Sequence, residues 1–153
     1  MKLWPAVAVV CLMSVASSVV AQTSSRCPAL PGSSSLQWQE RVAGDFLVCR
    51  ATTSDGREVL SLMLTRNDPD IRLPRALRQE KDSFAGETLY WYQPDLGGQQ
   101  PEGFADRRIS VVKIAKDRYA QLSLYPASSE ERSTLQQMVR GMNLSPAAVA
   151  AGR

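Results

Sequence analysis

The chain has 153 residues, of which 18 are Lys or Arg and 15 are Asp or Glu, so its formal net charge is +3. That charge is too small to predict nucleic-acid binding or general attraction to a membrane surface. The absence of histidine excludes Ser-His-Asp and Cys-His catalysis, histidine-ligated metals and a histidine pH switch.

The start of the chain has the pattern of a secretory signal peptide. Lys2 gives it a basic beginning, residues 3–20 are almost entirely apolar, and small residues lead up to Ala21. We expect cleavage before Gln22. The alternative is an uncleaved membrane anchor, because the apolar stretch is nearly long enough to span a bilayer. The expected location is therefore the periplasm or the outside of the cell.

The cysteines agree with export. Cys11 lies in the signal segment, and the mature chain keeps Cys27 and Cys49. Two cysteines in an exported chain predict one disulfide, with a metal pair or a reactive thiol as the alternatives. The expected organisation is a signal peptide over 1–21, an irregular N-terminal segment over 22–35, a single α+β domain over 36–144 and a flexible tail over 145–153.

Two β-hairpins are predicted by apolar residues that alternate along the chain. The first spans 44–66, where Asp55-Gly56 can supply the positive φ of a tight turn. A separate strand is expected within 86–93, in the sequence "GETLYWYQ". The second hairpin spans 107–127 and has Lys116-Asp117 in its turn.

Two helices are also expected. Pro74 suits the first turn of a short connector helix, and residues 76–81 are good helix formers. A longer helix begins after Ser128, which can form a capping box with Glu131. One apolar stripe of that helix contains Leu135, Met138, Val139 and Met142. The predicted fold class is α+β: an antiparallel sheet of about five to six strands, packed by an amphipathic C-terminal helix and the short connector helix.

This order of elements resembles the Mog1/PsbP-like α+β sandwich of small exported bacterial domains of the DcrB type. The resemblance is carried by "LPGSSSLQW" before the first strand, "AGETLYWY" in mid-chain, and "DRYAQLSLYPASSEERSTLQQMV" near the end. It implies an exported α+β domain and does not by itself imply an activity. The alternative parent is the small disulfide-bonded lysozyme inhibitors of the periplasm, whose Ser-Gly-x-x-Tyr inhibitory segment is not found here.

Three consecutive rings, Tyr90, Trp91 and Tyr92, raise the question of what lies on each face of their strand. In one interpretation Leu89 and Trp91 pack under the C-terminal helix, and the tyrosines are half-buried with solvated hydroxyls. In the other, the tyrosines contact a partner, because rigid aromatic side chains are favoured interface anchors. The long Gly-rich loop over 94–107 would belong to the same surface.

A second candidate site is cationic. Arg72, Arg75, Arg78 and Lys81 recur at every third position, along one side of the predicted connector helix. They could meet an acidic protein, a phosphate-bearing lipid or an acidic glycan, or form an ordinary solvated face. The predicted partner-binding residues are Tyr90, Tyr92, Asp95, Gln99, Gln100, Glu102, Phe104, Arg72, Arg75 and Arg78.

No catalytic constellation is evident, so the sequence predicts neither an enzyme nor a cofactor or metal site. The carboxylates of Glu87, Asp95, Glu102 and Asp106 match no acid–base motif. No Gly-rich phosphate loop is found.

The predicted function is binding. We expect an exported protein-binding domain, an inhibitor or immunity-type factor that acts on an envelope enzyme or toxin. The alternative is an envelope accessory domain that binds a small amphipathic ligand or a cell-wall fragment, which an apolar cavity of a few hundred Å³ would favour. The expected partner is another envelope or secreted protein, with no nucleic acid, and with membrane contact only through the signal segment before cleavage.

Overall fold

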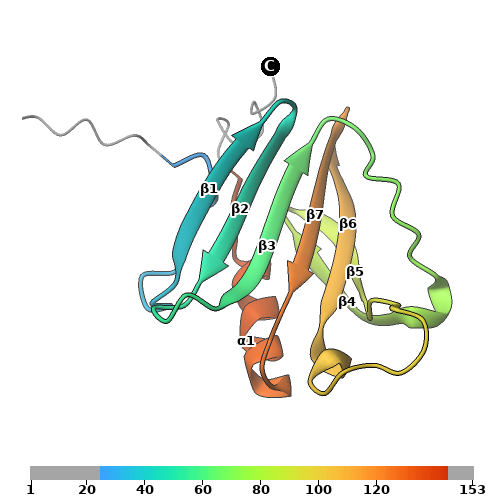
Figure 1. The fold of residues 1–153 in the computed structure, drawn as a ribbon. Coiled ribbons are helices and arrows are strands. Elements are labelled where there is room, and N and C mark those ends of the chain that lie inside the picture. Colours follow the sequence, from blue (N-terminus) through green and yellow to red (C-terminus); the bar gives the residue numbers. More distant parts are fainter. Residues whose placement is uncertain (1–24, 145–153) are drawn as a thin grey trace, which may run out of the picture.

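A seven-stranded antiparallel sheet forms the body of the protein in the computed structural model, which describes residues 25–144 (Figure 1). The predicted signal peptide and the predicted tail over 145–153 lie outside the described residues. The strands are β1 (Gln37–Ala43), β2 (Phe46–Thr52), β3 (Glu58–Thr65), β4 (Arg78–Phe84), β5 (Glu87–Tyr92), β6 (Arg108–Ala115) and β7 (Arg118–Leu124). Their spatial order is β1-β2-β3-β7-β6-β5-β4.

Both predicted hairpins are present. β2 pairs with β3, and β6 pairs with β7, each in antiparallel register. Apolar side chains at alternate positions then meet across neighbouring strands: Cys49 lies opposite Leu62, which in turn lies opposite Leu122. These side chains are completely buried on one face of the sheet. The period-two pattern that predicted the hairpins therefore reports the core face correctly.

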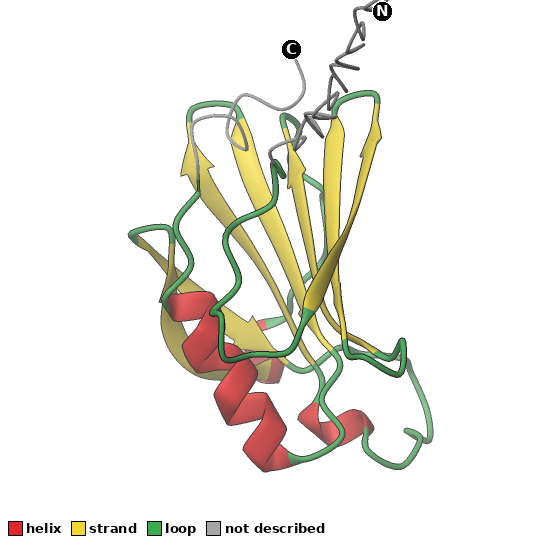
Figure 2. Ribbon diagram, turned by 90° about the vertical axis from the view of Figure 1, so that its left-hand side faces the viewer, coloured by secondary structure: helices red, strands yellow, loops and turns green. Residues whose placement is uncertain are grey.

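The C-terminal helix covers this buried face. α1 (Ser129–Arg140) lies on one side of the sheet in Figure 2, and it is the only α-helix among residues 25–144. Ser128 caps it as predicted, because its side chain accepts a hydrogen bond from the Glu131 amide at 3.1 Å. The Glu131 carboxylate accepts from the Ala127 amide, one residue before the position that a capping box requires. Leu135 and Val139 pack into the core as expected.

The irregular N-terminal segment is fixed to the same face by the predicted disulfide, Cys27–Cys49. Pro28 beside it is buried, and its carbonyl accepts a 2.6 Å hydrogen bond from the indole of Trp38. The carboxylate of Glu40 accepts from the amide of Arg26 at 2.8 Å. Closing this loop stabilises the fold by roughly 3 kcal/mol in the chain-entropy model.

The predicted connector helix is wrong. Residues 75–77 make a single 3₁₀ turn, and the chain then extends as β4, which pairs with β5. Helix propensity over 76–81 is overridden because the strand satisfies its backbone against β5 and buries Phe84. Its other inward positions, Glu80 and Asp82, are carboxylates, so the alternation along β4 is one of charge and carries no apolar signal.

The prediction of five to six strands is also too low. Besides β4, the sequence gives no signal for β1, whose residues are exposed except for the half-buried Trp38. β1 forms because its backbone pairs with β2 along its whole length, from Gln37 opposite Thr52 to Ala43 opposite Phe46. Within residues 25–144 no helix is long and apolar enough to cross a membrane.

An ion pair and a hydrogen bond join α1 to β4. The guanidinium of Arg140 donates to Asp82 at 2.6 Å, and the side-chain amide of Gln136 donates to Glu80 at 3.3 Å. Burial raises the pKa of both carboxyl groups, but hydrogen bonds from their partners lower it by more. The pKa of Asp82 falls below its usual 3.8 and that of Glu80, which also bonds to Arg108, below its usual 4.5.

These contacts predict acid sensitivity at the joint between helix and sheet. Because both folded pKa values lie below the unfolded values, the stabilisation is complete above the usual pKa values and is lost as pH falls through the folded ones. Urea unfolding between pH 7 and pH 3 should therefore show stability declining below about pH 4.5. Asp82→Asn should flatten the decline, and Asp45→Asn, an exposed carboxylate in the β1–β2 turn, should leave it unchanged. Equal slopes in wild type and Asp82→Asn would contradict the prediction.

Candidate functional site

The face of the sheet opposite α1 carries the candidate site. Strand alternation places Phe46, Val48 and Arg50 on this face, whereas Leu47 and Cys49 point into the core. A sheet with one face buried is expected to be polar on the other. Here the second face also carries aromatic and apolar side chains beside its cationic ones, and these fall into two groups.

The first group lies on β4 and β5. Leu89 and Trp91 are buried in the core, and the indole of Trp91 donates to Asp82 at 3.2 Å. Tyr90 and Tyr92 point to the opposite face and are half-buried. The three consecutive rings therefore divide between the faces, with one in the core and two on the surface.

Arg78 organises the two tyrosines. Its guanidinium carbon lies 4.0 Å from the centroid of the Tyr90 ring and 5.6 Å from that of Tyr92. Its Nη2 and Nε also donate to the Tyr92 hydroxyl, at 3.1 and 3.3 Å. Stacking of this kind contributes about 0.5–1 kcal/mol at an exposed site. We call Arg78, Tyr90 and Tyr92 the arginine–tyrosine cluster: its three side chains are held in place before any partner arrives.

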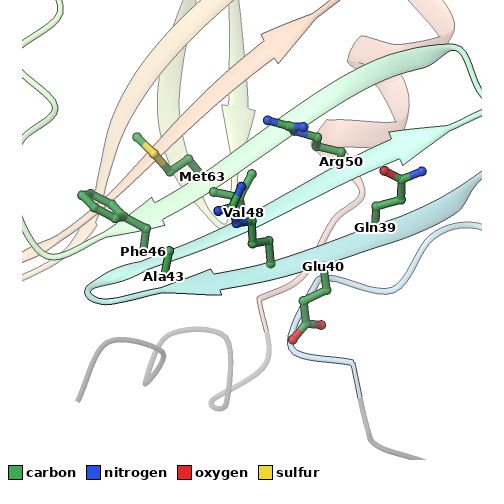
Figure 3. A pocket seen from close by; sticks show the side chains of 8 residues that line it. Gln39, Glu40, Ala43, Phe46, Val48, Arg50 and Met63 are labelled. Carbon is green, nitrogen blue, oxygen red and sulfur yellow. The ribbon is translucent and has the colours of Figure 1, made fainter.

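The second group forms a groove over β1, β2 and β3, with a cavity of about 460 Å³ (Figure 3). Val48 and Met63 are direct cross-strand partners, and Phe46, which is 42% exposed, lies beside them near the β1–β2 turn. Arg41 and Arg50 bring guanidinium groups to the lining, which Gln39, Glu40 and Ala43 complete. None of these residues is among the predicted binding residues. The groove is lined on one side by β1, and the polar sequence of β1 does not predict a strand.

Charge on this face is predominantly positive. The register places Lys81 opposite Tyr90 and Lys113 opposite Tyr119, whose ring centroid lies 5.7 Å from the ammonium nitrogen. Arg41 and Arg50 add two further cations at the groove. The carboxylate of Glu58 is 3.9 Å from Arg50, and both side chains are exposed, so solvent screens the pair. The face therefore suits an anionic or acidic binding partner.

The loop after β5 has both exposed and buried predicted residues. Asp95, Gln99, Gln100 and Glu102 are exposed, and Gln100 accepts a 2.9 Å hydrogen bond from the Gln93 side chain. These residues follow the arginine–tyrosine cluster directly along the chain.

Phe104 requires a correction as a predicted partner-binding residue. It lies in the 3₁₀ turn Phe104–Asp106 and is buried, with only 3% of its surface exposed. The guanidinium of Arg107 lies 5.3 Å from its ring centroid and 5.4 Å from that of Tyr125. Phe104 therefore anchors the end of the loop and does not present its ring to a partner.

The predicted cationic stripe also fails as a stripe, because the helix that would align it is absent. Arg72 and Arg75 are exposed in the segment before β4, whereas Arg78 belongs to the arginine–tyrosine cluster. Only Arg78 and Lys81 of the four are brought beside the tyrosines by strand pairing.

Within residues 25–144, no group of three or more His, Cys, Asp or Glu side chains could hold a metal ion. The carboxyl groups of Glu80, Asp82 and Glu131 have a lowered pKa, and each bonds to an arginine that joins two elements. Hydrogen bonding from Arg57 is the main cause for Glu131. The groups that this surface presents are stacked rings, guanidinium groups and an apolar groove.

Comparison with protein-family models, with curated proteins and with solved structures finds no match for this chain.

Proposed function

We propose that the protein is an exported binding domain, of inhibitor or immunity type, that recognises another envelope or secreted protein through the arginine–tyrosine cluster and the loop over 94–107. The signal-like start of the chain and the Cys27–Cys49 disulfide support export. The observation that carries the proposal is the fixed stacking of Arg78 on Tyr90 and Tyr92, on the face without a helix.

Three physical features support a protein partner. Tyrosine and arginine are enriched among interface residues that dominate binding energy. A side chain that is already ordered loses less conformational entropy on binding, and Arg78 is ordered by its contacts with Tyr92. The cluster lies on the paired strands β4 and β5, so its position is more rigid than that of a loop. The exposed residues Asp95 to Glu102 can then supply the polar rim that surrounds such a centre.

The test is capture of a partner by the oxidised protein, expressed as the full chain in an exporting cell, from envelope and secreted proteins of its own host. Wild type is compared with Tyr90→Ala/Tyr92→Ala and with the control Tyr125→Ala, whose ring also lies against an arginine. The double variant should lose affinity for a stoichiometric partner by about 30-fold or more, which corresponds to the 2 kcal/mol that marks a dominant interface residue. Circular dichroism checks that all variants fold.

Two results would contradict the proposal. One is a partner whose affinity is the same for wild type and the double variant. The other is the absence of any stoichiometric protein partner for all three baits.

A second candidate function is favoured by the groove over β1, β2 and β3. Its cavity of about 460 Å³ falls in the range of small-molecule sites, about 300–1,000 Å³. In this alternative the protein is an envelope accessory domain that binds a small amphipathic ligand.

A further inference from the structure

We propose that this groove binds a single-chain lipid anion, that is, one apolar chain carrying a carboxylate or phosphate head. The inference rests on the second candidate function and names its ligand. It is separate from the arginine–tyrosine cluster, which lies on the strands at the other end of the sheet.

The groove changes from apolar to polar along the strands. In antiparallel register Ala43 lies opposite Phe46, Arg41 opposite Val48, and Gln39 opposite Arg50. Going from the β1–β2 turn along β2, the lining therefore passes from the Phe46 ring, through Val48 with Met63 beside it, to the Arg50 guanidinium. Four residues of strand span about 13 Å. A ligand extended along β2 would thus meet the Phe46 ring at one end and the Arg50 guanidinium at the other, with Arg41 opposite Val48 between them.

The two guanidinium groups are available to an anion. Arg41 has no carboxylate partner among residues 25–144, and Arg50 has only the long contact to Glu58. Figure 3 shows Glu40 pointing away from the groove, and its carboxylate is bound by Ser25 and Arg26 on the other face. The anionic residue nearest in sequence to Arg41 therefore does not neutralise it. Guanidinium groups bind carboxylate and phosphate through charge-assisted hydrogen bonds.

The apolar part determines the class of anion. Free phosphate or a small carboxylate would leave Phe46, Val48 and Met63 in contact with water, whereas an alkyl chain would remove that apolar surface from it. A neutral detergent would cover the apolar part and leave both guanidinium groups without a counter-ion. A monomeric amphiphile with one chain and one anionic head satisfies both halves of the groove.

The test uses three probes below their micelle-forming concentrations: dodecyl phosphate, dodecyl maltoside and inorganic phosphate. Isothermal titration calorimetry should show dodecyl phosphate binding at least about tenfold more tightly than either other probe, because only it makes both kinds of contact. Arg41→Gln/Arg50→Gln should remove that preference. Val48→Ser should weaken dodecyl phosphate and leave any weak phosphate binding unchanged. The control Arg72→Gln, which changes an exposed arginine outside the groove, should match wild type.

The outcomes separate this inference from the functions proposed above. Equal binding of dodecyl phosphate and dodecyl maltoside would overturn anion recognition while leaving an amphiphile carrier standing. Equal binding of dodecyl phosphate and inorganic phosphate would reduce the groove to an anion site. Binding only to vesicles of anionic phospholipid, and not to monomers, would indicate a membrane-surface site instead. No binding of any amphiphile would remove both the inference and the second candidate function.

Tyr90→Ala/Tyr92→Ala should leave the affinity for dodecyl phosphate unchanged. A loss of that affinity would mean that the ligand binds at the arginine–tyrosine cluster and not in the groove.

Discussion

Replacing Trp91 with alanine is expected to lower the free energy of unfolding by about 3–5 kcal/mol, the cost of emptying a fully packed aromatic site. The Trp91 side chain is completely buried between the sheet and α1, and its indole is one of the hydrogen-bond donors to Asp82. Truncation would leave a cavity in the core and take one donor from a carboxylate whose side chain is only 3% exposed. Urea unfolding of the oxidised protein, followed by circular dichroism, measures the effect.

The neighbouring ring is the matched control. Tyr90 lies on the other face of the same strand and is half-buried, so Tyr90→Ala should cost about 1 kcal/mol. A Trp91→Ala variant no less stable than Tyr90→Ala would mean that β5 presents the opposite face to the core. That result would also remove the basis for a binding surface at Arg78.

Arg108→Met is expected to destabilise the fold by about 3 kcal/mol, near the lower limit for breaking a buried ion pair, because Glu80 on the other side is partly solvated. The Arg108 side chain is only 4% exposed. Its Nε and Nη2 donate to Glu80 at 2.9 and 3.0 Å, and its Nη1 donates to the carbonyl groups of Ala105 and Arg107, both at 2.8 Å. Methionine fills much of the volume but leaves these acceptors without their donor.

An exposed ion pair provides the comparison. Arg57 donates to Glu131 at 2.7 Å, but its side chain is 41% exposed, so Arg57→Met should cost at most about 1 kcal/mol. Urea midpoints of the two variants, measured at pH 7, give the comparison directly. If Arg108→Met were as stable as Arg57→Met, the network around Glu80 would not contribute to holding the loop end and α1 against the sheet.

The sequence correctly predicts those parts of the fold in which the buried positions are occupied by apolar side chains. The two hairpins and α1 each have an apolar face of their own, such as Leu60, Leu62 and Leu64 on β3. The disulfide follows from the number of cysteines and the signal-like start, without any geometry. These elements need no knowledge of distant residues.

β4 could not be predicted in this way, because its inward side chains are acidic and their partners are far along the chain. Glu80 meets Arg108, 28 residues later, and Asp82 meets Arg140, 58 residues later. When those partners are not known, the local sequence of residues 76–81 predicts a solvent-exposed helix. The Mog1/PsbP resemblance used that helix as one of its elements, so it stays a prediction that now depends on the hairpins and the C-terminal helix.

The candidate site was predictable only in part for the same reason. Three adjacent rings identify the tyrosines from the sequence. The sequence includes Arg78 only as part of a stripe on a helix that the fold does not contain. Its actual role comes from strand pairing, which sets Arg78 opposite Tyr92. The groove depends on β1, and "QWQERVA" has no periodic apolar signal by which to identify a strand.

The strand order has a consequence for how the molecule assembles. β7 lies between β3 and β6, although it is the last strand in the sequence, and it pairs Leu124 with Leu60. The hairpins that precede it cannot join into one sheet until this strand is available, and contacts between such distant residues slow folding. A chain emerging N-terminus first, from the ribosome or through a translocation channel, therefore remains two unconnected halves until nearly all of it is present. That delay suits a polypeptide expected to cross a membrane before it folds. The Cys27–Cys49 pair, by contrast, lies entirely within the first half and can close early.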